Sequence, residues 1–487
     1  MLRIYDSMSR SKRSLSPCVP GKVGIYVCGM TVYDFCHIGH ARVLVVFDMV
    51  VRYLRSLGLD VTYVRNITDI DDKIINRAAQ HGEPFEALTE RFIAAMHEDC
   101  AALFLQPPDL EPRATGHITD IVDMVQRLIE RGYAYVGSSG DVFFSVRKFA
   151  DYGKLSGETL DELWTGARVD ADESKRDPLD FVLWKRAKPD EPYWPSPWGD
   201  GRPGWHIECS AMSTRCLGNH FDIHAGGMDL QFPHHENEIA QSVAATGDAF
   251  ARLWMHNGYV QVDREKMSKS LDNFFTIREI LTQDNFPARM GEIIRYMVLS
   301  SHYRSPLNFS QQALDNAKAA LTRLYLVLDK VTEITEETPT RQPVSAGDAG
   351  DWRAYSQRFH EAMNDDFNSP EAIAVLFDLT REINRQLDAN REAVAATLAD
   401  GLIALAGILG LINLNPADFL GKAGGVRSAD HDWLDMSDVA VQRLVDERNA
   451  ARDNRDWQTA DRIRKRLTAK GVILEDKPNG TTQWRIE

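Results

Sequence analysis

Cysteine is scarce in this chain, and the few cysteines stand far apart. There are six in 487 residues, at positions 18, 28, 36, 100, 209 and 216. They are too sparse for a disulfide scaffold in a chain of this length, and without a C-x-x-C pair their spacing alone indicates no zinc ribbon. In a reducing compartment such residues are free thiols, catalytic groups or metal ligands.

Long apolar runs are also missing, and we expect no secretory leader. No stretch approaches the roughly 18 consecutive apolar residues that a membrane span needs. The N-terminal region is basic, with Arg3, Arg10, Lys12 and Arg13. Polar residues interrupt each short apolar run there, so no secretory apolar region follows. We therefore expect a cytoplasmic protein that does not enter a membrane.

Positive charge is in short supply. The formal net charge is −15, which argues against indiscriminate binding to nucleic acid, because phosphate contacts need a basic surface. Residues 441–487 lean the other way, with 11 lysines and arginines against 8 acidic residues. A nucleic-acid partner would have to meet locally concentrated positive charge, and this last segment is a candidate for it.

The chain does contain the opening of a doubly wound sheet. Residues 24–28 are rich in β-branched and aromatic side chains, which is typical of a buried strand, and residues 61–64 predict a second strand. Between them, apolar residues recur at helical spacing over 41–57, and Gly58 suits a helix end. The ligand site of such a unit lies at the carboxyl ends of its strands.

A second block repeats this pattern. Residues 220–224 are strand-like and are followed by Gly226 and Gly227. A helix is then expected from about residue 233 to 243. The mixed segment between the two blocks, about 110–200, ends in a stretch rich in proline and tryptophan. It looks like an insertion between two halves of one catalytic domain.

The later part of the chain is helical in pattern. Leucines and alanines at 3-4 spacing over 314–328 predict a packed helix. The fold class that we expect is α/β: a doubly wound, Rossmann-like parallel-sheet catalytic domain with an insertion, then a helical bundle and a small mixed C-terminal domain. The expected bounds are 1–308 for the catalytic domain, 309–414 for the bundle, 415–434 for a linker and 435–487 for the C-terminal domain.

Residues 37–40 read HIGH and lie between the first strand and its helix. Gly39 has no side chain, so a flat ligand can lie against the backbone there. His37 and His40 at a helix N-terminus offer hydrogen-bond donors to a phosphate, reinforced by the helix dipole. Taken alone, the motif equally describes two surface histidines at a helix start.

Residues 266–270 read KMSKS. Lys266 and Lys269 in a polar loop can hold a pyrophosphate leaving group, although such a loop by itself is often only a solvated turn. A HIGH motif after an early strand, with KMSKS more than 200 residues later, resembles the signature pair of class I aminoacyl-tRNA synthetases.

Four residues could hold a metal. His234 and Glu238 are four apart on an expected helix and point from one face, whereas the two residues directly after His234 are expected to face elsewhere. Cys28 ends the first strand, and Cys209 follows the stretch WHIE. Zinc takes thiolate, imidazole and carboxylate ligands. The alternative is that the cysteines are small buried hydrophobes and that His234 and Glu238 form a solvated helix pair.

The resemblance narrows to the cysteine–tRNA ligase family, densest over residues 20–310. The segments that carry it are 27–34 (VCGMTVYD), 66–73 (NITDIDDK), 203–212 (PGWHIECSAM) and 226–238 (GGMDLQFPHHENE). It implies ATP-dependent ligation of L-cysteine to tRNA(Cys) through a cysteinyl-adenylate, by a monomer. It also implies one zinc ion per chain that selects the cysteine thiol, and Mg²⁺ with ATP.

The same resemblance implies roles for individual residues. The implied zinc ligands are Cys28, Cys209, His234 and Glu238. The other implied roles are catalysis by His37, His40, Lys266 and Lys269; ATP binding by Gly29, Gly39, His37, His40 and Lys269; cysteine binding by Thr68, Trp205 and Asp229; and tRNA binding by Arg452, Trp457 and Trp484. Arginines and tryptophans of that last kind contact phosphates and stack unpaired bases.

Two positions depart from the family pattern. Asp272 stands where a glycine usually follows KMSKS, which adds negative charge beside a phosphate-handling loop, and Gln483 stands where the family more often runs directly to Trp. Two other functions stay open. One is a related ligase that passes activated cysteine to an amino sugar and has no anticodon-reading tail. The other is a catalytically silent, synthetase-like binding module.

Overall fold

The computed structural model describes residues 1–159, 174–263, 265–266, 273–335, 352–421, 438–453, 456–468, 472–477 and 482–486. The chain forms two compact units. The first comprises Met1–Leu314, Ala354–Val375 and Ile408–Leu411, and the second comprises Asp315–Arg353, Leu376–Gly407 and Ile412–Glu487. Within the described residues, no helix combines the length and the apolar character that crossing a membrane requires.

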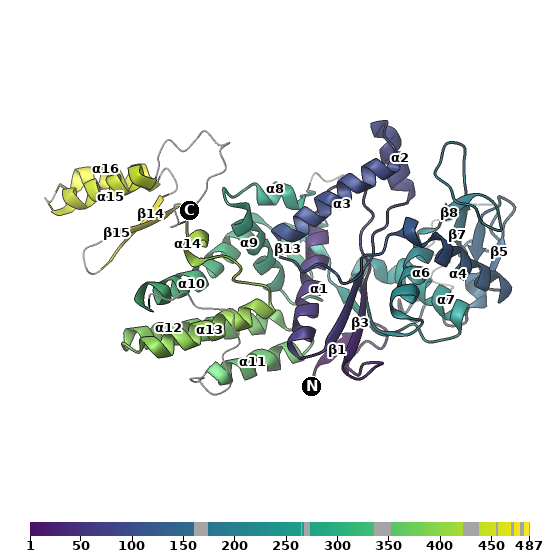
Figure 1. Ribbon diagram of the computed structural model, residues 1–487, viewed down its shortest axis with the longest axis horizontal. Helices are drawn as coiled ribbons and strands as arrows, with labels where there is room; N and C mark the ends of the chain where they lie inside the picture. Colours follow the sequence, from purple (N-terminus) through teal and green to yellow (C-terminus); the bar gives the residue numbers. More distant parts are fainter. Residues whose placement is uncertain are drawn as a thin grey trace. The chain divides into compact units, whose positions relative to one another are not determined.

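A four-stranded parallel sheet lies at the centre of the first unit (Figure 1). In spatial order its strands are β10 (Ala251–Asn257), β9 (Phe221–Gly227), β3 (Lys22–Val27) and β4 (Asp60–Arg65). The chain leaves β3 towards β4 on one side and leaves β9 towards β10 on the other. The order therefore reverses between β3 and β9, and doubly wound sheets bind ligands at such a switch point. The expected fold class is confirmed.

Helix α1 (Ile38–Ser56) connects β3 to β4. It begins three residues earlier than the apolar spacing predicts, because His37 caps it: the ring Nδ1 accepts the backbone N–H groups of Gly39 at 3.1 Å and His40 at 3.3 Å. Residues 44–51 are all buried, so the helix is covered on every side over this stretch and not along one face alone. Gly58, with a φ of +78°, ends the helix as expected, because glycine adopts this conformation without strain.

The chain between β9 and β10 departs from a simple helix. A π-helical turn, Gln231–His235, precedes helix α7 (Glu236–Thr246), and Phe232 inside the turn has extended backbone angles. The helix expected from residue 233 therefore begins at residue 236. The turn contains the two adjacent histidines His234 and His235, and both are buried.

An antiparallel sheet fills the segment expected as an insertion. Its strands, in spatial order, are β5 (Ala134–Val136), β6 (Val142–Phe144), β7 (Phe181–Arg186) and β8 (Gly201–Pro203). Helix α4 (Ile118–Glu130) precedes this sheet and α6 (Trp205–Leu217) follows it. Val125, Leu183 and Ile207 share one buried apolar cluster, so the sheet and both helices pack together (Figure 1).

The first unit also contains further helices and strands that precede residue 310. They are β1 (Arg3–Asp6), β2 (Ser11–Ser14), α2 (Asp72–His81), α3 (Phe85–Ala102), β11 (Val260–Val262), β12 (Glu265–Lys266), α8 (Ile277–Leu281), α9 (Pro287–Leu299) and β13 (Leu307–Phe309).

Helices dominate from residue 311 onwards. They are α10 (Gln311–Thr335), α11 (Trp352–Asn364), α12 (Ser369–Asp388), α13 (Glu392–Ile408) and α14 (Pro416–Phe419). The leucine stripe expected over 314–328 is buried, which confirms the helix. Because α14 lies inside the stretch expected as a linker, and residues 422–437 lie outside the described chain, the domain bounds given above stay predictions.

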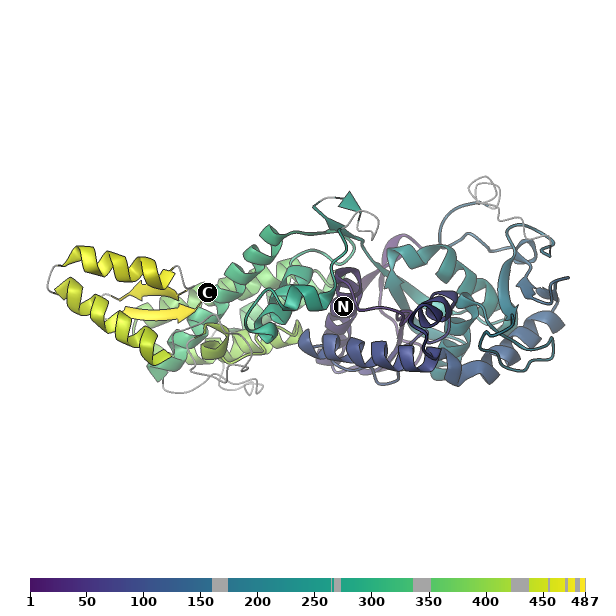
Figure 2. The ribbon, with the colours of Figure 1, turned by 90° about the horizontal axis from the view of Figure 1, so that it is seen from above.

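The C-terminal segment forms a small mixed structure of its own. Helices α15 (Asp438–Asp453) and α16 (Trp457–Thr468) lie side by side next to the antiparallel hairpin of β14 (Val472–Asp476) and β15 (Thr482–Ile486), as Figure 2 shows. Its core consists of Val445, Ile463, Leu467 and Val472. Among the described side chains, Leu444, Leu474 and Trp484 pack against this cluster, so the segment has a small hydrophobic core of its own.

Candidate functional site

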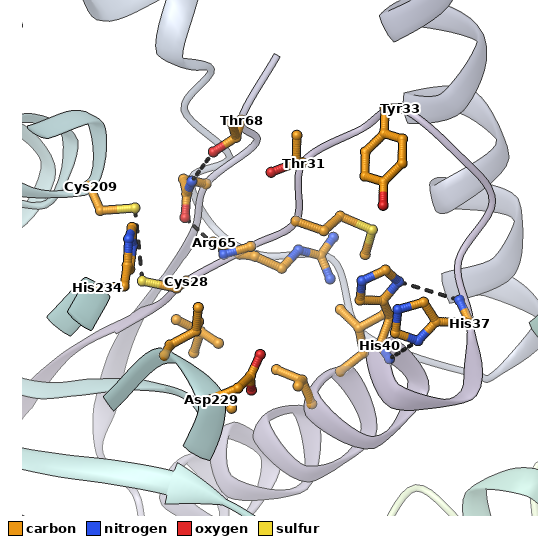
Figure 3. A pocket seen from close by; sticks show the side chains of 18 of the residues that line it. Cys28, Thr31, Tyr33, His37, His40, Arg65, Thr68, Cys209, Asp229 and His234 are labelled. Atoms are coloured by element: carbon orange, nitrogen blue, oxygen red, sulfur yellow. Dashed lines mark hydrogen bonds between the residues drawn. The ribbon is translucent and has the colours of Figure 1, made fainter. Parts of the chain in front are cut away.

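A pocket of about 280 Å³ opens at the carboxyl ends of β3 and β9, at the switch point of the sheet. Cys28 and Gly29, directly after β3, line it, and so does Asp229, just after β9. Figure 3 shows Cys28, Cys209 and His234 at one end of the pocket and His37 and His40 at the other. The two candidate groups from the sequence therefore share one cavity.

Cys28, Cys209, His234 and Glu238 form the cluster that the sequence predicted, and we call it the thiol cluster. One potential ligand atom from each lies within 4.8 Å of every other, and all four residues are buried. The two Sγ atoms are 3.8 Å apart. Nε2 of His234 is 3.1 Å from Oε1 of Glu238, and Sγ of Cys28 is 3.5 Å from the same oxygen.

The thiol cluster fits a tetrahedral metal. Zinc–sulfur bonds of about 2.3 Å place two thiolates of a tetrahedron about 3.8 Å apart, which is the observed separation. The hydrogen bond from Cys28 and the proximity of His234 lower the pKa of Cys209 to about 6 against the effect of burial. Although burial opposes it, Glu238 and Cys209 raise the pKa of His234 to about 10. The cluster thus favours a thiolate and a cation side by side.

Two further histidines reach the same cysteine. Nε2 of His235 is 3.3 Å from Sγ of Cys28, and Nε2 of His224 is 3.5 Å from it and 3.3 Å from Oε2 of Glu238. With Cys28 and Glu238 they form a second group that could hold a metal. The expectation that His235 faces elsewhere is wrong, because residues three apart on a helix share a face and Nε2 of His235 lies 3.9 Å from Oε1 of Glu238. His224 on β9 was not predicted as part of the site. The available signal was a histidine in a strand that is buried along its whole length.

The HIGH histidines have defined tautomers. Nδ1 of His37 accepts backbone N–H groups, and Nδ1 of His40 accepts the backbone N–H of His37 at 3.3 Å. A neutral ring whose Nδ1 accepts must have its hydrogen on Nε2. Burial and the neighbouring His37 hold the pKa of His40 well below its usual value, so this ring stays neutral at pH 7. The two rings stack with centroids 3.6 Å apart.

The segment after KMSKS is joined to the HIGH loop. The backbone N–H of Ile38 donates to the carbonyl of Phe275 at 3.0 Å, and that of Ile277 donates to the carbonyl of Cys36 at 2.8 Å. The ring of Phe274 meets the ring of His37 edge-on, with centroids 4.9 Å apart. Residues 274–277 are thus neighbours of the HIGH loop. Residues 267–272, with Lys269 and Asp272, and the side chain of Lys266 lie outside the described structure.

Comparisons with known proteins cover the whole chain. A family model described as the tRNA synthetases class I (C) catalytic domain matches residues 14–319, a DALR domain matches 358–413, and a cysteinyl-tRNA ligase anticodon binding domain matches 437–485. A cysteine–tRNA ligase from Thioalkalivibrio sulfidiphilus is 58% identical over 487 residues, with 100% of each chain covered. The chain belongs to the cysteine–tRNA ligase family.

Another member of the cysteine–tRNA ligase family, from Methylococcus capsulatus, is 58% identical over 488 residues and is also covered completely. Among solved structures, Mycobacterium tuberculosis methionyl-tRNA synthetase in complex with methionyl-adenylate aligns with a TM-score of 0.57 and 16% identity, over 84% of this chain and 95% of that one. At that identity the likeness concerns the fold alone, and it supports the class I sheet described above.

The residues that the family resemblance assigns to cysteine all line the pocket. They are Thr68, Trp205 and Asp229. The ring of Trp205 lies 4.4 Å from that of His234, centroid to centroid, and it is 39% exposed, so one face is available to a ligand. Thr68 is buried beside the cavity, and its hydroxyl donates to Glu208. The sequence reading missed Glu208, although it adjoins Cys209.

The two glycines assigned to ATP differ in position. Gly29 lines the pocket, and a Cβ atom there would lie 1.7 Å from the backbone oxygen of Asn66, so no larger residue fits without a backbone shift. Gly39 is not among the described lining residues. Its N–H group is already used by the His37 cap.

The residues assigned to tRNA lie in the C-terminal segment, where the cysteine–tRNA ligase model for anticodon binding matches. Trp457 begins α16 and is 62% exposed. Trp484 instead packs against the small core and donates from Nε1 to Gln442 at 2.8 Å. Arg452 is half-buried near the end of α15. Of the three, Trp457 has the geometry for stacking on a base.

Proposed function

We propose that the chain catalyses the ATP-dependent ligation of L-cysteine to tRNA(Cys) through a cysteinyl-adenylate intermediate. The observation that carries this proposal is that one pocket has the thiol cluster at one end and the paired histidines His37 and His40 at the other. The first group suits a substrate sulfur, and the second suits a phosphate. Full-length identity to cysteine–tRNA ligases supports the same activity.

Zinc is the metal that we propose for Cys28, Cys209, His234 and Glu238. When bound there, it would supply a soft Lewis acid that accepts the thiolate of cysteine far better than the hydroxyl of serine. Apolar pockets separate such near-isosteres by only about 10- to 200-fold. We therefore propose that the metal serves selectivity rather than hydrolysis, which removes the need for an editing domain.

In the first step the carboxylate oxygen of cysteine forms a bond to the α-phosphorus of ATP, and the bond to the leaving pyrophosphate breaks. His37 and His40 donate from Nε2–H to the phosphate oxygens, and their neutral state lets them stabilise the developing charge without transferring a proton. Lys266 and Lys269 hold the pyrophosphate, and Mg²⁺ bound with ATP would neutralise part of its charge. Catalysis by these groups is positioning and electrostatic stabilisation.

Within the pocket, Thr68, Trp205 and Asp229 hold the amino and carboxyl groups of cysteine, and the backbone at Gly29 and Gly39 lets the nucleotide approach closely. In the second step a terminal ribose hydroxyl of the tRNA attacks the adenylate carbonyl, an ester forms, and AMP leaves. These assignments follow the family resemblance at the matching positions.

We propose that residues 435–487 read the anticodon through Trp457, Trp484 and Arg452. The match of residues 437–485 to an anticodon binding domain favours tRNA over an amino sugar as the acceptor of cysteine. We further propose that the chain acts as a monomer in the cytoplasm, where its six free cysteines stay reduced.

Two assays on the full chain test this proposal. ATP–pyrophosphate exchange should depend on cysteine, which a catalytically silent binding module would not support. ³⁵S-cysteine should then be transferred to tRNA(Cys) and not to an amino sugar. ATP–pyrophosphate exchange at the same rate with and without cysteine would contradict the proposal, and so would transfer of cysteine only to the amino sugar.

A further inference from the structure

Residues 231–238, which we call the ligand turn, carry two of the proposed metal ligands, His234 and Glu238. Two helical pieces meet at a kink inside this turn, because the backbone of Phe232 is extended. The regular hydrogen bonds of helix α7 therefore do not by themselves fix the residues that precede it. Contacts with other segments of the chain must help to hold the ligand turn in one geometry.

Glu236 makes the main contact of this kind. It lies between the two ligands in sequence, and its side chain is fully buried. Oε1 accepts the backbone N–H of Gly153 at 2.9 Å, and Oε2 accepts those of Leu155 at 3.1 Å and Ser156 at 2.9 Å. A backbone N–H only donates, so the direction of these hydrogen bonds does not depend on the charge of Glu236.

The three donors belong to the insertion, and their segment is shaped to receive a carboxyl group. Gly153 has a φ of +94°, and a Cβ atom there would lie 2.1 Å from the backbone oxygen of Glu158, so a larger residue would require a backbone shift. Successive N–H groups that converge on one point form a concavity that typically binds an anionic group. Here the side chain of Glu236 fills this concavity.

Two more hydrogen bonds join the same two segments. The hydroxyl of Tyr152 donates to Oδ1 of Asn237 at 2.5 Å. Nε2 of Gln231 donates to the backbone carbonyl of Leu155 at 2.9 Å. The insertion therefore contacts the ligand turn on both sides of His234.

We infer that segment 152–156 is a positioning element for the metal site, with Glu236 as its main contact. It holds the ligand turn where the side chains of the thiol cluster meet. The inference rests on the proposed function, because it takes zinc to bind at the thiol cluster. Groups that orient metal ligands from outside the ligand set typically contribute about 10- to 100-fold to metal affinity. The insertion thus takes part in selecting cysteine, since the substrate sulfur is proposed to bind the same metal.

Glu236→Gln tests the main contact. The amide has one acceptor oxygen in place of two, and in either orientation its NH₂ group faces a backbone N–H. The zinc affinity of the full chain, measured by competition with a chelator of known affinity, should fall at least about 10-fold. Co²⁺ bound in place of zinc should show a weaker and shifted d–d absorption, because that spectrum reports the geometry of the ligands.

Tyr152→Phe tests the contact from the side of the insertion. It keeps the ring and removes one hydrogen bond to the ligand turn, so zinc affinity should fall about 3-fold or more. This milder change decides the question alone if Glu236→Gln does not fold.

Asp222→Asn is the matched control. Asp222 is a buried carboxylate on β9 that accepts the backbone N–H groups of Cys18 at 2.6 Å and Gly24 at 2.8 Å, and it is not a member of the thiol cluster. Asp222→Asn should lower stability in urea, as Glu236→Gln does, but it should leave zinc affinity and the Co²⁺ spectrum unchanged.

The outcomes are distinct. Wild-type zinc affinity and a wild-type Co²⁺ spectrum in both Glu236→Gln and Tyr152→Phe would overturn the inference. An equal loss of zinc affinity in Asp222→Asn would also overturn it, because the loss would then come from general destabilisation. A wild-type chain that binds no zinc would instead contradict the proposed metal, and the inference with it.

Discussion

The variant Cys209→Ser removes one proposed zinc ligand. It alters little else, because serine differs from cysteine by a single atom, oxygen in place of sulfur. The side chain is buried, with 2% of it exposed. A complete structural zinc site contributes about 10–16 kcal/mol, so one ligand of four accounts for about 3 kcal/mol. At about 1.4 kcal/mol per tenfold change, zinc should bind Cys209→Ser about 100-fold more weakly. Because the substrate sulfur is proposed to bind the same metal, cysteine affinity should fall with zinc occupancy.

The assay is competition for zinc with a chelator of known affinity, followed by titration with cysteine. Cys216→Ser is the matched control, because Cys216 lies on the same helix, α6, but outside the thiol cluster. It should keep both zinc and cysteine affinity. A Cys209→Ser variant that retained one zinc per chain and wild-type cysteine binding would refute the assignment of the cluster.

Three other predictions follow from the same geometry and chemistry. Burial raises the pKa of Cys28 well above its usual value, and the pKa of metal-free His234 is about 10, so both side chains carry protons at pH 7. Zinc binding should therefore release two protons per ion near pH 7, and zinc affinity should rise about 100-fold per pH unit. Calorimetry in buffers of different ionisation enthalpy measures the number of protons released. Gly29→Ala should lower the free energy of unfolding by about 1–3 kcal/mol through the backbone clash, and it should weaken the binding of ATP. Gly407→Ala is the control, because a Cβ there would meet nothing within 4 Å, and it should raise the free energy of unfolding by up to about 1 kcal/mol. Urea unfolding measures both. Lys269→Ala should slow ATP–pyrophosphate exchange by orders of magnitude with an unchanged circular dichroism spectrum, and a rate near wild type would exclude the lysine from catalysis.

Most of the sheet was predictable because its signals are local. The apolar period of α1 and the β-branched run of β3 depend on neighbours within a few residues, and both elements form with bounds that differ from the expected ones by at most three residues. Once a doubly wound sheet is predicted, a ligand site at the strand ends follows from topology. The pocket beside Cys28 and Gly29 is that site.

The histidine geometry was less predictable. His234 and His235 precede Glu238 by four and three residues, so helical geometry alone brings both towards that carboxylate. The approach of His224 to Cys28 depends instead on the register between β3 and β9, which no local sequence pattern marks. The hydrogen-bond partners of the two HIGH histidines could not be predicted from the sequence either. The reason is that serine, threonine or aspartate usually caps a helix, and histidine does so more rarely.

The central claim is that the thiol cluster selects cysteine through a bound soft metal. The most direct test compares kcat/KM for activation of cysteine and of serine, by zinc-loaded and by metal-stripped chain. We predict that the zinc-loaded chain discriminates by more than the roughly 200-fold limit of apolar pockets, and that stripping the metal removes this excess. A metal-free chain that still prefers cysteine by several thousandfold would contradict the account.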